Sequence, residues 1–177
     1  HADWTDPNLL SWLDKDLASA KQARWRFVVL HHPPFQSSKE HFNNQWMRVL
    51  APRFEKHRVN VVWSGHVHNY QRSHPLRFQP SGPKDKDGKV DGKISLDTKF
   101  DGIKNTRPGG ILYVVTGAGG ASLYEKYESA DGKPMAFTAK MVNNTHSLTV
   151  VDIDDRKLSI RQVAADGKEI DKITVTQ

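Results

Sequence analysis

Two apolar runs that each end in histidines constrain the fold of this chain most strongly. The run Val59–Trp63 leads, through a serine and a glycine, into His66 and His68. The run Trp25–Leu30 leads directly into His31. Near-continuous apolar runs of this kind are typical of central strands that are buried on both faces of an α/β sheet. Because such sheets carry their chemistry just beyond the strand ends, two ends that deliver imidazoles predict a metal site.

Helical patterns around these two runs predict an α/β fold. Asp6 followed by Pro7 is typical of a helix start, and leucines then recur at helical spacing. Ser37 or Ser38 is expected to cap a second helix, which is interrupted at Pro52. A helix that precedes a buried strand indicates a crossover connection within a layered sheet structure.

The rest of the chain predicts a third strand, a long loop and a closing meander. The run Ile111–Val115 is the third strand, and a glycine-rich segment follows it. Residues 79–110 are rich in Gly, Pro, Lys and Asp, which indicates a loop or exposed hairpin that borders the site without building the core. Short alternating runs in residues 146–177 indicate an antiparallel meander. With 37% hydrophobic content, residues 1–177 are expected to form a single domain.

Composition narrows the chemistry and the partners. The sequence has no cysteine, so histidine and carboxylate remain as candidate metal ligands. The net charge of +6 would attract anions, but the lysines are interspersed with aspartates, and we expect no nucleic acid partner. No apolar run approaches the roughly 18–20 residues that a membrane helix needs, and the first residues lack the pattern of a signal peptide. We therefore expect no membrane partner.

His66, His68 and His31 offer three nitrogen donors. Histidines two residues apart point the same way while strand geometry persists, and Gly65 allows the backbone to turn so that both rings face one cavity. Three imidazoles suit zinc, iron or manganese, and they leave room for a water whose pKa the metal lowers. Hydrolysis is the natural chemistry of such a site. The alternative is that these are hydrogen-bonded residues at strand ends.

His32 and His41 have weaker assignments. Adjacent residues of an extended chain point to opposite faces, so His31 and His32 cannot easily share one metal, and one of the two is expected to support the site or the fold. His41 lies ten residues beyond His31, at the expected start of a helix. An imidazole there could protonate a leaving group, or it could face solvent.

Three segments, Leu30–Phe35, Gly65–Ser73 and Tyr113–Gly120, carry a family resemblance. Together they resemble the calcineurin-like metallophosphoesterases, and most closely their purple acid phosphatase-like branch. The resemblance extends from Asp6 to about Val150. It implies the C-terminal half of the catalytic domain, which is a four-layer α/β/β/α sandwich, here with a terminal antiparallel meander.

The resemblance also implies a mechanism and a set of metal ligands. A metal-bound hydroxide would attack a phosphate ester between two divalent or mixed-valence ions of Fe, Zn or Mn in the intact enzyme. His31 and His66 would bind one ion, and His68 would bind the other. The function implied is that of a phosphatase or phosphodiesterase.

Further roles follow from the resemblance alone. His41 would assist the leaving group as a catalytic residue, and Tyr70 and Arg72 would bind the substrate at the rim of the site. Gly119 and Gly120 would lie close beneath it. The resemblance implies a secreted or periplasmic location.

Half of the family's metal ligands are missing from this sequence. The N-terminal half of that family supplies an Asp-x-His element, a Gly-Asp element with a bridging aspartate, and a Gly-Asn-His element, none of which is present. Two divalent ions at roughly 3.5–4 Å would repel each other strongly without an anionic bridge. We therefore expect this chain to supply about half of a dinuclear site. The missing aspartates would come from its own N-terminal half or from a companion chain.

Two alternative functions remain open. A noncatalytic binding or assembly module, which has lost the N-terminal ligands, would bind without turnover. A mononuclear zinc hydrolase would use His31, His66 and His68 alone and would hold one metal per chain.

Overall fold

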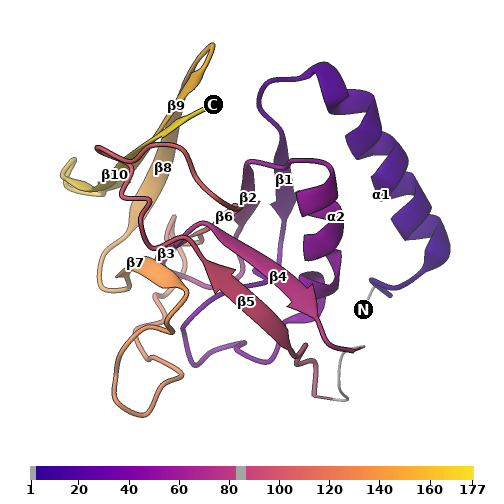
Figure 1. Ribbon diagram of the computed structural model, residues 1–177. Coiled ribbons are helices and arrows are strands. Elements are labelled where there is room, and N and C mark those ends of the chain that lie inside the picture. The colour runs from indigo at the N-terminus through magenta and orange to yellow at the C-terminus, as the bar shows by residue number, and fades with distance from the viewer. Residues whose placement is uncertain (1–2, 83–86) are drawn as a thin grey trace.

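The main structural element is a mixed sheet of five strands (Figure 1). The computed structural model describes residues 3–82 and 87–177. The strands of this sheet are β1 (Phe27–Leu30), β2 (Val61–Ser64), β3 (Tyr70–Ser73), β6 (Leu112–Thr116) and β7 (Thr138–Val142). Their order is β1-β2-β6-β3-β7; the first three are parallel, and β3 is antiparallel to both of its neighbours. The three predicted apolar strands are therefore adjacent and parallel.

The first helix, α1 (Pro7–Ser19), begins where the sequence predicts. The Asp6 carboxylate accepts a hydrogen bond from the amide of Asn8 at 2.7 Å. Pro7 occupies the first turn, where its missing N–H costs nothing. A short 3₁₀ turn, η1 (Ala20–Gln22), then leads toward β1. In the described part of the chain, no helix has the length and apolar character to span a bilayer.

The second helical segment starts later than predicted. It comprises η2 (Trp46–Leu50) and α2 (Ala51–Lys56). Ser37 and Ser38 do not cap it, because both lie well before Trp46 and their hydroxyl groups contact the side chains of Thr138 and Asn69 instead. Pro52 lies in the first turn of α2 and does not interrupt a longer helix. The position of the proline is favourable there for the same reason as at Pro7.

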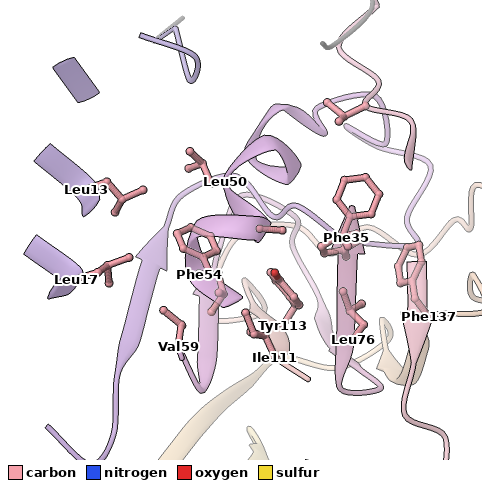
Figure 2. Packing of buried hydrophobic residues seen from close by; sticks show 14 residues of the cluster. Leu13, Leu17, Phe35, Leu50, Phe54, Val59, Leu76, Ile111, Tyr113 and Phe137 are labelled. Carbon is pink, nitrogen blue, oxygen red and sulfur yellow. The ribbon is translucent and has the colours of Figure 1, made fainter. Parts of the chain in front are cut away.

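Two apolar clusters hold three layers together. The cluster in Figure 2 packs α1 and α2 on one face of the main sheet, through residues such as Leu17 and Phe54. The other cluster joins the opposite face to an antiparallel meander, with Leu112 on the sheet and Ile173 on the meander. The strands of this meander are β8 (Ser147–Asp154), β9 (Lys157–Ala164) and β10 (Glu169–Thr176). The described residues thus form three layers, and the four-layer sandwich is not confirmed.

The stretch 79–110 contributes to the core, contrary to expectation. Its first part belongs to a hairpin of β4 (Leu76–Pro80) and β5 (Gly92–Leu96), and residues 83–86 lie outside the described residues. Val90 and Phe100 are 1% and 5% exposed, and each belongs to one of the two apolar clusters. The hairpin was predicted, but its contribution to the core was not, because polar composition hides the few apolar side chains that fold back onto the sheet.

Candidate metal centre

The ends of β1 and β2 bring the predicted histidines to one edge of the sheet. The two strands are parallel, with Leu30 opposite Ser64. Just beyond them, the amide of Gly65 donates a hydrogen bond to the carbonyl of His31 at 3.1 Å. The two segments that follow the strands therefore leave the sheet side by side.

Three histidines from these segments gather their ring nitrogens in one place. His31, His32 and His66 each offer a nitrogen, and these atoms lie within 4.8 Å of one another. Nε2 of His31 is 3.1 Å from Nδ1 of His66, and the ring centroids of His32 and His66 are 4.1 Å apart. Across residues 3–82 and 87–177, this is the one group of three or more histidine and carboxylate side chains close enough to hold a metal ion.

His32 joins this group, although strand alternation predicted that it would point away from His31. The prediction was wrong because β1 ends at Leu30, so both histidines lie in a bend and not in extended chain. Their ring centroids are 5.0 Å apart, with an interplanar angle of 89°. The prolines at 33 and 34 were the signal that the strand ends early, because proline cannot donate a hydrogen bond to a sheet.

The backbone turns sharply at His66. Its φ of 59° lies in the left-handed region. For a residue that has a side chain, this conformation costs on the order of 1–3 kcal/mol of conformational free energy. We expected Gly65 to provide the turn, but the positive φ falls on the histidine itself. Strain of this kind is common at functional sites, where the surrounding structure holds it in place.

The environment favours the neutral form of two members of this group, His66 and His32. Burial, followed by the charges of His32, His41, His31 and His68, lowers the pKa of His66 to about 4. Burial also lowers the pKa of His32. Neutral imidazole is the form that binds metal ions, and Nε2 of His66 is buried without a hydrogen-bond partner. The donor set therefore fits a divalent ion that prefers nitrogen ligands, such as zinc.

His68 stands apart from the three-histidine group. Its Nδ1 is 2.9 Å from the carbonyl oxygen of Ser122, and its ring stacks on Tyr124 with centroids 4.3 Å apart and planes 18° apart. Because a carbonyl only accepts, Nδ1 of His68 is the donor and Nε2 keeps the lone pair. Ligating histidines are commonly held in this way, but a metal role for His68 stays a prediction.

His41 lies beside the group, in a turn and not in a helix. Its φ is 60°, and its ring centroid is 4.1 Å from that of His66. Its Nε2 is 3.4 Å from the hydroxyl of Tyr124. This position is compatible with donation of a proton to a leaving group, which stays a prediction.

Tyr70 and Arg72 use their polar atoms elsewhere. The Tyr70 hydroxyl donates to Oδ2 of Asp171 at 2.7 Å, and Arg72 donates to both carboxylate oxygens of Asp171 at 2.7 and 3.1 Å. Both side chains are buried, and that of Tyr70 lies in the cluster between the main sheet and the meander. These contacts join two sheets, so the placement favours a structural role over the expected contact with substrate.

The sequence did not indicate that two further residues belong to the site. Ser122 and Tyr124 contact His68 and His41 across 54 and 83 positions of the chain, respectively. Neither lies at a strand end or in a recognisable motif. Local periodicity does not report contacts between residues so far apart in sequence.

Several curated proteins are similar to part of this chain. An uncharacterized protein of Mycobacterium tuberculosis is 32% identical over 120 residues, which are 63% of this chain and 20% of the relative. A purple acid phosphatase of Glycine max is 38% identical over 66 residues, which are 35% of this chain and 14% of the relative. The Fe(3+)-Zn(2+) purple acid phosphatase 12 of Arabidopsis thaliana is 36% identical over 66 residues, with shares of 35% and 14%. No family model matches the chain.

Two solved structures share the fold. The purple acid phosphatase PPD1 from yellow lupin (Lupinus luteus) seeds has a TM-score of 0.64 at 19% identity, over 97% of this chain and 28% of that chain. GAP50, the anchor in the inner membrane complex of Plasmodium, has a TM-score of 0.64 at 16% identity, over 96% of this chain and 42% of that chain. This chain spans about a fifth or less of the curated relatives above.

Proposed function

We propose that this chain, a calcineurin-like region of the purple acid phosphatase-like branch, supplies part of the active site of a metal-dependent phosphatase or phosphodiesterase. The observation that carries the proposal is the meeting of His31, His32 and His66 within 4.8 Å. They stand beyond the ends of two parallel strands, which is where open α/β sheets carry their chemistry. A secreted or periplasmic location is proposed on the resemblance alone.

The histidines at this site would have two roles, metal binding and proton donation. His31, His32 and His66 would hold one ion, and Nε2 of His68 would bind a second one. The ions, of Fe, Zn or Mn, supply an activated water and positive charge against the phosphate oxygens. His41, whose ring centroid lies 4.1 Å from that of His66, would give its proton to the oxygen of the leaving group.

Carboxylates from outside this sequence are part of the proposal. The three-histidine group contains no carboxylate among the described residues, so it offers no anionic donor. Two divalent ions at roughly 3.5–4 Å need an anion between them to offset their repulsion. Aspartates on an N-terminal segment or on a companion chain would supply that anion.

Metal content tests this function directly. Elemental analysis of protein purified without chelators, paired with intact mass, counts the ions per chain and detects any co-purifying segment. Hydrolysis of p-nitrophenyl phosphate and of bis(p-nitrophenyl) phosphate distinguishes monoesters from diesters. We expect two ions and turnover when the carboxylate-bearing segment is present. A metal-free protein without turnover, with that segment present, would overturn the proposal.

Two variants test whether metal binding and turnover depend on the three-histidine group. His66→Ala removes the central member of the group and should abolish both turnover and binding of at least one ion. His57→Gln is the matched control, because His57 contacts Asp14 on α1 at 2.8 Å and lies outside the group. One ion per chain, with turnover, would indicate a mononuclear hydrolase instead.

The absence of a carboxylate from the described group also favours a second candidate. A noncatalytic binding or assembly module would keep the histidines without the anionic bridge that a dinuclear reaction needs. The same assays separate the two functions: metal bound in stoichiometric amount without hydrolysis of either ester, in the assembled protein, supports the module.

A further inference from the structure

The loop after β6 places one tyrosine between two histidines of the candidate metal centre. The ring of Tyr124 stacks on His68, and its hydroxyl lies 3.4 Å from Nε2 of His41. Tyr124 is only partly buried and belongs to neither of the two apolar clusters. Packing of the core therefore does not explain its position.

The main chain around Tyr124 holds the same histidine at other points. The amide of Tyr124 donates to the carbonyl of His68 at 3.0 Å, and the Asn69 side chain donates to the carbonyl of Tyr124 at 2.9 Å. The carbonyl of Ser122 accepts from Nδ1 of His68. His68 is thus held at its ring face, at one ring nitrogen and at its own carbonyl. One ring orientation results, in which Nε2 is the nitrogen left free.

The loop is also tied to the segment that precedes His41. Segments 37–39 and 126–128 pair through two backbone hydrogen bonds of 2.9 Å. These bonds lie close to His41 on one side and to Tyr124 on the other. Because they join two backbones, Tyr124 and His41 keep their relative position.

We propose that Tyr124 is a positioning residue of the metal centre. Its ring face holds the ring of His68 in the orientation in which Nδ1 donates to the carbonyl of Ser122 and Nε2 is left for a metal ion, and its hydroxyl orients the ring of His41. The consequence for catalysis rests on the proposed function, whereas the tautomer of His68 is a property of the metal-free protein.

Long-range ¹H–¹⁵N spectra of the metal-free protein show which ring nitrogen of His68 carries the proton. We expect a single tautomer, protonated at Nδ1. Tyr124→Leu keeps apolar bulk but removes the ring face, and it should allow both tautomers to exchange. Tyr124→Phe keeps the ring face and should keep the tautomer. Tyr127→Leu is the matched control on the same loop, where the backbone of Tyr127 pairs with Ser38.

Zinc affinity, measured by competition with a chelator, gives a second readout. Loss of the partners that hold a ligating histidine commonly lowers metal affinity by about 10–100-fold, and we expect that fall for Tyr124→Leu. Tyr127→Leu should keep the wild-type affinity. One tautomer together with wild-type affinity in Tyr124→Leu would overturn the positioning role.

Tyr124→Phe tests the hydroxyl contact in a variant that keeps the ring. We expect kcat for esters with poor leaving groups to fall by about 10-fold at unchanged KM, because only proton donation by His41 is affected. Equal kcat values in Tyr124→Phe and wild type would overturn the role of the hydroxyl. A protein that hydrolyses no ester, but whose His68 tautomer still depends on Tyr124, would overturn the proposed function and support the positioning of His68.

Discussion

Asp171 joins the closing meander to the main sheet through a single carboxylate. The side chains of Arg72 and Asp171 are 10% and 11% exposed. Asp171→Asn removes the charge and leaves the buried guanidinium unpaired, so we expect the free energy of unfolding to fall by about 3–5 kcal/mol. Urea unfolding followed by tryptophan fluorescence measures the change. Asp152→Asn removes an exposed ion pair with Arg161 and, as the control, should cost less than about 1 kcal/mol.

The same carboxylate makes stability depend on pH. Burial alone would raise the pKa of Asp171, but the hydrogen bond and charge of Arg72, with further contributions from Tyr70 and Lys140, hold that pKa below its usual value. The stabilisation is therefore present above about pH 4 and is lost as pH falls through the pKa of the folded state. Between about pH 5 and about pH 2, wild type should lose more stability than Asp171→Asn. Equal slopes in the two proteins would contradict this prediction.

The loops that follow β2 and β6 meet at Gly117. Its amide donates to the carbonyl of Asn69 at 3.1 Å, and a Cβ added at this position would collide with the carbonyl oxygen of Val67. The resemblance implied Gly119 and Gly120 as the glycines close to the site. A Cβ at either of these positions would meet nothing within 4 Å. Gly117 is therefore the glycine at which the backbones of the two loops come close together.

Gly117→Ala should push the loop that carries His68 away from β6. We expect an overpacking cost of about 1–3 kcal/mol, seen as a lower melting temperature, together with weaker zinc binding. Gly119→Ala adds the same methyl group in open space and should leave both quantities unchanged. Wild-type stability and metal affinity in Gly117→Ala would show that the loops can separate without consequence.

At the scale of the whole molecule, no strand of the described residues pairs with the outer edge of β1 in the main sheet. β1 is the terminal strand on the side of α1, and Val29 on this strand is 78% exposed. Trp12 on α1 is 60% exposed, and both residues line a hollow of about 220 Å³ between the helix and the strand. An open strand edge beside apolar surface favours pairing with another strand.

We expect the 177-residue chain on its own to self-associate through this edge. Val29→Lys places a charge on the open strand and should shift the protein toward monomer in sedimentation velocity measurements. Ile103→Lys, at an equally exposed apolar residue in a loop, is the control and should leave association unchanged. Association that responds equally to both variants would indicate a nonspecific hydrophobic effect.

Local patterns in the sequence were enough to identify most of the regular elements. The apolar runs before His31 and His66 became adjacent parallel strands, because continuous burial of this kind is typical of central strands. Asp6 and Pro7 identified the start of α1, because capping depends on neighbouring residues alone. The clustering of His31 with His66 followed from these strands, because parallel strands end at the same edge.

Tertiary structure decided the remaining members of the site. His32 entered the group because the chain bends after Leu30, and the pattern of alternation did not report where the strand ends. Tyr124 and Asp171 reach their partners across distances in sequence that no local pattern covers. The sequence by itself determined the strands, the first helix and the histidines that two strand ends deliver, because each depends on neighbouring residues. Only the packed structure decided which nitrogens meet and where Tyr70 and Arg72 point, because these contacts depend on how distant segments fold together.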